Sequence, residues 1–148
     1  MTTFYRINEK GETKPCKETE GITTKPLGAF NRWVSIENNT IGRYFVYTSF
    51  IGQGGPPSSN PILFESGLSD SKNRKGYMVI KRICRTIKEA YVAHLLTLLQ
   101  VRKLLIKKRD YKLVRKTDRI IQKLYKKVPG LSNRRKWKGV KIITHYRF

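Results

Sequence analysis

Apolar and polar residues follow different patterns in successive parts of the chain. Residues 1–29 are polar and interrupted by Gly and Pro, and they predict an extended N-terminal arm with one short strand at Thr3–Ile7. Residues 30–51 are rich in aromatic and β-branched side chains, which favour strands. We expect a β-hairpin whose strands, 30–36 and 41–51, flank the turn-prone sequence Glu-Asn-Asn-Thr.

The second strand of this hairpin carries apolar residues on both of its faces. Strands of this kind are covered on both sides in folded proteins, so we expect the same here. The sequence Gly-Gln-Gly-Gly-Pro-Pro-Ser-Ser-Asn-Pro then predicts a flexible loop over 52–61. Its glycines match no phosphate-binding loop, because neither the spacing nor the flanking strand and helix are present.

Residues 77–128 contain no Gly or Pro and show a helical period. One apolar stripe consists of Ile80, Ile83, Cys84, Ile87, Ala90, Tyr91, His94, Leu98, Val101 and Leu105. A second stripe consists of Leu113, Val114, Thr117, Ile120, Ile121, Leu124, Tyr125 and Val128. The two stripes point to nearly opposite sides of one straight helix, which could not bury both in one core. We therefore predict a break at 108–111, with Asp110 capping the second helix of an antiparallel hairpin.

The last part of the chain, residues 129–148, is a basic extension that starts with the helix-stopping pair Pro129-Gly130. Residues 140–148 alternate like a strand, and this strand could join the sheet formed by 30–51. The predicted fold class is α+β: a small antiparallel sheet packed with a long helical hairpin at about 77–128, with extended N- and C-terminal arms. The predicted organisation is an arm at 1–29, a single domain at 30–128 and the basic extension.

Charge is distributed very unevenly along this pattern. The chain has 148 residues and a formal net charge of +22, far more than solubility requires. Residues 1–71 hold seven basic and seven acidic residues, whereas 72–148 hold 25 basic residues and three acids. Such an asymmetry indicates a polyanionic partner, either a nucleic acid or a negatively charged surface.

The second predicted helix concentrates this charge on one face. Eight basic residues fall opposite its apolar stripe: Lys108, Arg109, Lys112, Arg115, Lys116, Arg119, Lys123 and Lys126. The two nearby acids, Asp110 and Asp118, lie outside that face, so opposite-charge pairs cannot balance it. A second basic group surrounds an indole ring, which could stack on unpaired bases or serve as an ordinary packing anchor: Arg134, Arg135, Lys136, Trp137 and Lys138. We predict both groups to be nucleic-acid-binding.

Candidate catalytic or metal-binding chemistry is sparse. The cysteines Cys16 and Cys84 and the histidines His94 and His145 show no zinc-site spacing, and we expect reduced thiols. His94 falls on an apolar helix face, which is typical of a core histidine, and Asp110 and Asp118 are better suited to capping and local ion pairs than to Mg²⁺. We therefore predict a protein that is not an enzyme, has no metal or other cofactor, and takes no small-molecule substrate.

The function that fits these features is a non-catalytic, RNA-binding structural component of a large ribonucleoprotein, most simply a ribosomal or organellar ribosomal protein. Its partners would be RNA, rRNA above all, and neighbouring proteins. A viral nucleic-acid-binding protein has the same chemistry, and a basic scaffold or linker protein that bridges acidic subunits is an alternative. Binding at a membrane surface is a weaker alternative, since the two apolar stripes can bury each other.

The N-terminal composition and the length of the apolar runs indicate the cellular location that we expect. Residues 1–25 contain four glutamates and no apolar run, which argues against both a signal peptide and a transit peptide. The longest nearly apolar run, 90–101, is too short to span a bilayer. We expect a cytoplasmic protein or one in the matrix of a mitochondrion or plastid, and not a secreted one.

Overall fold

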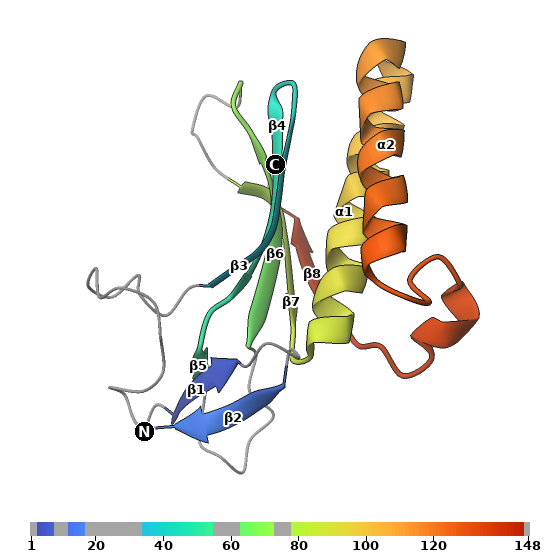
Figure 1. Cartoon of the computed structure of the whole chain (residues 1–148). Helices are drawn as coiled ribbons and strands as arrows, with labels where there is room; N and C mark the ends of the chain where they lie inside the picture. The colour runs from blue at the N-terminus through green and yellow to red at the C-terminus, as the bar shows by residue number, and fades with distance from the viewer. Residues whose placement is uncertain (1–2, 8–11, 17–33, 55–62, 73–77, 147–148) are drawn as a thin grey trace.

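A five-stranded antiparallel sheet forms the centre of the structure (Figure 1), which is a computed structural model describing residues 3–7, 12–16, 34–54, 63–72 and 78–146. The strands are β3 (Val34–Ile41), β4 (Tyr44–Phe50), β6 (Phe64–Asp70), β7 (Met78–Cys84) and β8 (Ile143–Tyr146). Their order in the sheet is β3-β4-β6-β7-β8. The predicted C-terminal strand therefore does join the sheet, as β8 at its edge beside β7.

A smaller sheet involves the N-terminal residues. Strands β1 (Thr3–Ile7), β2 (Thr13–Cys16) and β5 (Gln53–Gly54) pair in the order β2-β1-β5. The predicted strand at Thr3–Ile7 is confirmed, while two residues of the predicted loop 52–61 belong to β5. The rest of that loop from 55 onward, most of the N-terminal arm and the first hairpin residues, 30–33, lie outside the described residues.

Two helices cover one face of the larger sheet, which confirms the α+β class. Helix α1 (Ile87–Lys107) packs against β4, β6 and β7, while α2 (Tyr111–Lys127) packs against α1 and beside β3 (Figure 1). The two helices are antiparallel, as predicted. Asp110 caps α2 by accepting a hydrogen bond from the Leu113 backbone N–H at 3.3 Å, so the predicted break and cap are confirmed.

The core lies between the helices and the sheet. Helix α2 buries four residues of the predicted stripe, and α1 buries a longer set beneath it. The principal core cluster contains Ile41, Tyr44, Val46, Leu68, Ile80, Val92, Leu95, Leu98, Val101, Leu105, Val114, Ile121, Leu124 and Leu131. The opposite face of β4 is more open than predicted, because Phe45 is 39% exposed. The prediction that both faces of this strand are covered was therefore wrong at this end of β4.

The turn of the first hairpin was predicted at the wrong place. The sequence Glu-Asn-Asn-Thr lies within β3, and the chain reverses at Gly42-Arg43, where Gly42 has a φ of +58°. Glycine adopts this left-handed conformation without strain, so the tight turn forms there. The polar residues of β3 are held instead by tertiary partners: Asn39 by a buried histidine and Glu37 by a lysine of α2. These contacts outweigh the turn propensity of the asparagines.

The start of the helical region was also predicted wrongly. Residues 78–84 form β7, so Cys84 lies on a strand and not on a helix face, where it is a free, buried thiol. Helix α1 begins only after Thr86, whose hydroxyl accepts from the Glu89 N–H while Glu89 accepts from the Thr86 N–H, both at 3.2 Å. This reciprocal pair satisfies two backbone donors that would otherwise be free. Arg82 of β7 is buried and donates to the Thr97 hydroxyl at 2.7 Å.

Strand β6 was not predicted at all, although it lies at the centre of the sheet. Its sequence, Phe-Glu-Ser-Gly-Leu-Ser-Asp, has little apolar character, yet five of its residues are buried. The polar ones find partners: Glu65 pairs with Lys81 at 3.0 Å, and the Ser66 hydroxyl lies 2.8 Å from that of Thr48. Burial of polar groups that are hydrogen-bonded or ion-paired costs little free energy. The strand can therefore be buried although its sequence shows no apolar pattern.

Candidate nucleic-acid interface

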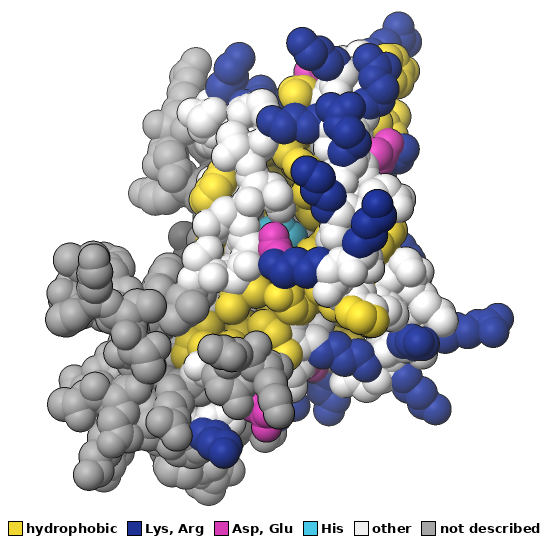
Figure 2. Space-filling model, viewed as in Figure 1, with side chains coloured by type: hydrophobic (Ala, Val, Ile, Leu, Met, Phe, Trp, Pro, Cys, Tyr) yellow, Lys and Arg dark blue, Asp and Glu magenta, His cyan; other side chains and the backbone are white. Residues whose placement is uncertain are grey.

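Helix α2 separates its apolar and basic residues onto opposite sides. Val114, Thr117, Ile121 and Leu124 are buried against α1 and the sheet. All eight residues of the predicted face are exposed, and we call them the α2 basic face: Lys108, Arg109, Lys112, Arg115, Lys116, Arg119, Lys123 and Lys126. Figure 2 shows Lys and Arg side chains gathered over the helical side of the molecule, with few acids among them. The predicted segregation of charge is therefore present in three dimensions.

The acidic side chains pair with cations outside the α2 basic face. Asp70 pairs with Arg43 at 2.7 Å, Asp118 with Arg102 at 2.6 Å, and Glu37 with Lys127. Glu65 pairs with Lys81. Within the described parts of the chain, no carboxylate forms an ion pair with a member of the α2 basic face. These charges are thus available to an external anion.

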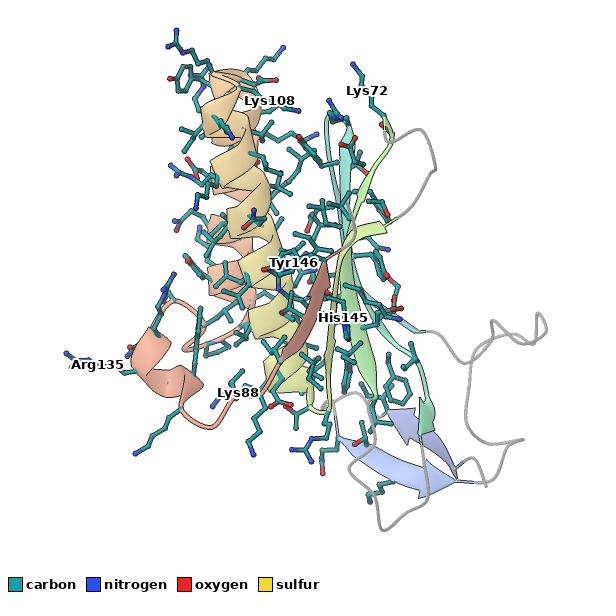
Figure 3. All side chains as sticks on the ribbon, turned by 180° about the vertical axis from the view of Figure 1, so that it is seen from behind. Lys72, Lys88, Lys108, Arg135, His145 and Tyr146 are labelled. Carbon is teal, nitrogen blue, oxygen red and sulfur yellow. The ribbon has the colours of Figure 1, made fainter. Side chains whose placement is uncertain are left out.

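Four residues of the second predicted group form a short 3-10 helix, η3 (Arg134–Trp137), beyond the C-terminal end of α2, and Lys138 follows it directly (Figure 1). Arg134, Arg135, Lys136 and Lys138 are exposed, and Figure 3 shows Arg135 pointing away from the rest of the molecule. Both predicted groups therefore belong to the helical side. Like the α2 basic face, these four cations form no ion pair with a described carboxylate.

Trp137 has a packing role in this structure. It is half-buried against the principal core, and its indole N–H donates to the Leu131 carbonyl at 2.9 Å. The Arg134 guanidinium lies 5.5 Å from the centre of the ring, at cation–π distance. These contacts favour the anchor interpretation over base stacking, because the ring already has protein neighbours. The cations around it remain exposed.

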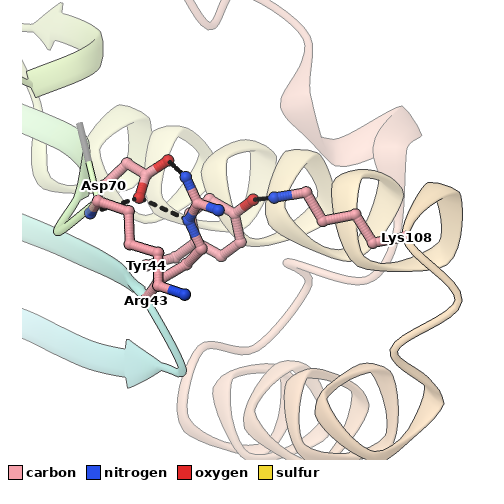
Figure 4. Close-up of polar contacts among 5 residues, drawn as sticks. Arg43, Tyr44, Asp70 and Lys108 are labelled. Carbon is pink, nitrogen blue, oxygen red and sulfur yellow. Dashed lines mark hydrogen bonds and ion pairs between the residues drawn. The ribbon is translucent and has the colours of Figure 1, made fainter. Parts of the chain in front are cut away.

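Lys108 differs from the other members of the α2 basic face. Its ammonium donates to the Tyr44 hydroxyl at 2.9 Å and lies 5.4 Å from the centre of that ring (Figure 4). Nearby, Arg43 holds Asp70 through two hydrogen bonds of 2.7 Å, and this guanidinium lowers the pKa of Asp70. Lys108 therefore ties the tip of the helical hairpin to β4. The side chains of the other seven members have no polar partner among the described residues.

A groove runs between the edge strand β3 and α2, next to the α2 basic face. Its volume is about 180 Å³, and it is lined by Glu37, Asn39, Ile120, Lys123, Leu124 and Lys127. The Lys127 ammonium is bound to Glu37, which raises the pKa of Lys127. Of these residues only Lys123 was predicted to bind, because Glu37 and Asn39 were assigned to a turn and Lys127 lies beside the predicted face. Recognising Gly42-Arg43 as the turn would have placed Glu37 and Asn39 on the strand.

A buried polar network lies behind this groove. His94 of α1 is fully buried, with Nε2 2.7 Å from Asn39 Oδ1 and Nδ1 2.7 Å from the Thr48 hydroxyl. Burial lowers the pKa of His94 to about 4, with a further contribution from Lys127, so the ring is neutral at pH 7. The prediction of a core histidine is confirmed. With the Asn39 oxygen facing the ring, the tautomer that fits this contact carries its proton on Nε2 and donates it to Asn39, because an amide oxygen can only accept.

Within the described ranges, no three His, Cys, Asp or Glu side chains lie close enough to hold a metal ion. Neither α1 nor α2 has the length and apolar character needed to cross a membrane. Comparisons with protein-family models, with curated protein sequences and with solved structures gave no match to this chain.

Proposed function

We propose that this protein is a non-catalytic, RNA-binding structural component of a large ribonucleoprotein, a ribosomal or organellar ribosomal protein in the simplest case. The observation that carries the proposal is the α2 basic face, where seven exposed cations have no partner among the described residues. Like charges at this spacing destabilise a helix by roughly 0.2–0.5 kcal/mol per pair. An array that is unfavourable for folding and free of internal counter-charge fits a role in binding an external polyanion.

A double-stranded RNA matches this surface better than a flexible acidic peptide does. A rigid helix presents its cations in a row, and a double-stranded RNA presents its phosphates in regular rows along each groove. Contacts to phosphates and sugars position a protein on RNA without reading sequence, since the deep A-form major groove is closed to side chains. The exposed cations of η3 lie beyond the end of α2 and extend the same basic side of the molecule. Shape and phosphate recognition by a structural protein is the function that these residues support.

Competition between two polyanions tests this proposal against the scaffold alternative. Fluorescence anisotropy would measure binding to a short RNA duplex and to a polyglutamate peptide of the same total charge, at one ionic strength. We expect the RNA to bind at least about tenfold more tightly, because a flexible peptide lacks a fixed, regular spacing of charges and must be ordered on binding. Equal binding of both polyanions, or tighter binding of the peptide, would favour a linker between acidic proteins and contradict the proposal.

A further inference from the structure

The groove between β3 and α2 differs chemically from the α2 basic face beside it. One wall carries cations, Lys123 and Lys127, while the floor is apolar, formed by Ile120 and Leu124. The opposite wall presents the amide of Asn39 and the carboxylate of Glu37, which is bound to Lys127. At about 180 Å³ the groove is smaller than the 300–1,000 Å³ pockets that hold drug-sized ligands. It suits a small, flat group that has apolar faces, a polar edge and an attached negative charge.

The Asn39 amide is held at one end by a contact with His94. Its Oδ1 accepts the Nε2–H of His94 at 2.7 Å, and His94 is itself held by the Thr48 hydroxyl. This arrangement occupies the oxygen end of the amide and leaves Nδ2 as the end that can reach a ligand in the groove. Among the described residues no partner for Nδ2 is present. An oriented donor beside an apolar floor is a feature of sites that bind a base edge.

The two lysines of the groove have different roles. Lys127 is neutralised by Glu37 and lies 6.0 Å from the centre of the Tyr91 ring, so it closes one side of the groove as a fixed wall. Lys123 is exposed and has no partner among the described residues, and it also belongs to the α2 basic face. A phosphate bound at Lys123 would therefore be part of the same RNA strand that α2 contacts.

We propose that this groove takes one unpaired nucleotide of the bound RNA, with its base on Ile120 beside the buried Leu124, a base acceptor at Asn39 Nδ2 and its phosphate at Lys123. The inference rests on the proposed RNA-binding function and adds a base-contacting site to it. Every RNA base carries an acceptor on an accessible edge, and Asn39 offers a donor alone. The groove therefore detects the presence of a base more than its identity, at a junction between duplex and single strand.

The test compares two single strands of equal charge. One is an oligouridine of about ten nucleotides, and the other is the abasic ribose-phosphate strand of the same length. We expect the intact strand to bind about tenfold more tightly, because one base contact of this kind contributes about that factor. Equal affinities for the two strands would overturn the groove proposal while leaving the phosphate-binding function intact. Binding of neither strand nor of duplex RNA at low salt would overturn the proposed function itself.

A matched pair of substitutions locates the effect. Asn39→Asp keeps an oxygen for His94 but removes the Nδ2 donor, so the preference for the intact strand should fall to about twofold or less. Asn38→Asp makes the same charge change at the preceding residue of β3, where the Asn38 side chain is bonded to Ser35 instead. This variant should keep the full preference for the intact strand. If Asn39→Asp keeps the preference, or if Asn38→Asp loses it equally, the base is not bound at Asn39.

A third variant changes the groove without changing charge. Ile120→Trp places a large ring over the floor, so it should abolish the preference for the intact strand and leave the affinity for the abasic strand unchanged. Circular dichroism would confirm that α1 and α2 are retained. A folded Ile120→Trp protein that still prefers the intact strand tenfold would place the base elsewhere and overturn the proposal.

Discussion

His94 is the residue at which burial and hydrogen bonding have the clearest thermodynamic consequence. It links α1 to β3 and β4 through Asn39 and Thr48 while its pKa falls from an ordinary 6.5 to about 4. Between these two values the unfolded chain binds a proton that the folded protein excludes. Stability from this group is therefore fully present above pH 6.5 and is lost as the pH falls towards 4. The loss amounts to about 3 kcal/mol, since each pKa unit corresponds to about 1.4 kcal/mol.

Urea unfolding at a series of pH values checks this prediction. The His94→Gln variant has no titrating ring at this position, so the free energy of unfolding of the variant lacks this contribution to the pH dependence. This holds whatever the absolute stability of the variant is. The difference between the natural protein and the variant should shrink as the pH falls from 7 to 4. A difference that stays constant over this range would show that His94 titrates normally in the folded state.

Arg109 is a second residue with an unusual local conformation. It follows the end of α1 with a φ of +58°, a left-handed conformation that costs an ordinary side chain about 1 kcal/mol and in which glycine is preferred. Arg109→Gly should therefore stabilise the protein by up to about 1 kcal/mol. The same change should weaken RNA binding and make the salt slope shallower by about one, because Arg109 belongs to the α2 basic face.

Lys112→Gln is the matched control for this substitution. It removes one charge from the same face at a residue of ordinary helical conformation, so binding should fall similarly without any gain in stability. Thermal unfolding and anisotropy on the three proteins supply both readouts. If Arg109→Gly binds RNA as tightly as the natural protein, an arginine at this strained position has no role in binding.

At the scale of elements, the helical hairpin was more predictable than the sheet. The two apolar stripes of α1 and α2 occupy opposite sides of a continuous period, and this alone required a break near Asp110. Strand β7 was predicted as part of a helix because its apolar residues continue the period of the helix that follows it. The capping pair Thr86 and Glu89 marks the true start of α1 and could have shown this boundary in the sequence. Strand β6 carries no apolar pattern, since its polar residues are matched by partners on strands distant in sequence.

Contacts between residues that are distant in sequence also decided which part of the candidate site could be predicted. The α2 basic face was visible in the sequence because its members share one helix and one period. The groove needs Asn39 of β3, Lys123 of α2 and His94 of α1, which only the folded chain brings together. A surface within one element can therefore be read from local spacing, whereas a pocket between elements requires their relative placement.

The cap of α2 gives a prediction at this scale. Asp110→Ala removes the acceptor for the Leu113 N–H and should lower the free energy of unfolding by about 1 kcal/mol. Asp110→Asn removes the same negative charge but keeps an oxygen at the cap, so it should lose much less. Urea unfolding of both variants measures this difference. Equal losses in the two variants would mean that the charge of Asp110 matters and its capping hydrogen bond does not.

At the scale of the whole molecule, the neutral and cationic halves of the sequence form one body. The change in charge near residue 71 falls between β6 and β7, which pair directly in the sheet, while the helices pack on strands from both halves. The neutral half therefore supplies three of the five strands, β3, β4 and β6, of the sheet on which the cationic helices are held. A net charge of +22 on one small body favours association with a polyanion and makes that association strongly dependent on ionic strength.

The most direct measurement of the central claim is the salt dependence of RNA-duplex binding in two variants that each lose four positive charges. One variant carries Lys112→Gln, Arg115→Gln, Arg119→Gln and Lys126→Gln on α2. The other carries Lys14→Gln, Lys72→Gln, Lys88→Gln and Lys103→Gln at exposed positions outside the α2 basic face; Lys72 lies at the top of the view in Figure 3 and Lys88 at the lower end of α1.

For the natural protein we expect a slope of log affinity against log salt of about −4 to −5. The α2 variant should stay folded, since glutamine keeps helix propensity, and its slope should become shallower by about one for each phosphate that the helix no longer neutralises. The variant with the distributed substitutions should keep nearly the full slope. An unchanged slope in the folded α2 variant, or an equal reduction in both variants, would contradict α2 as the phosphate-binding surface.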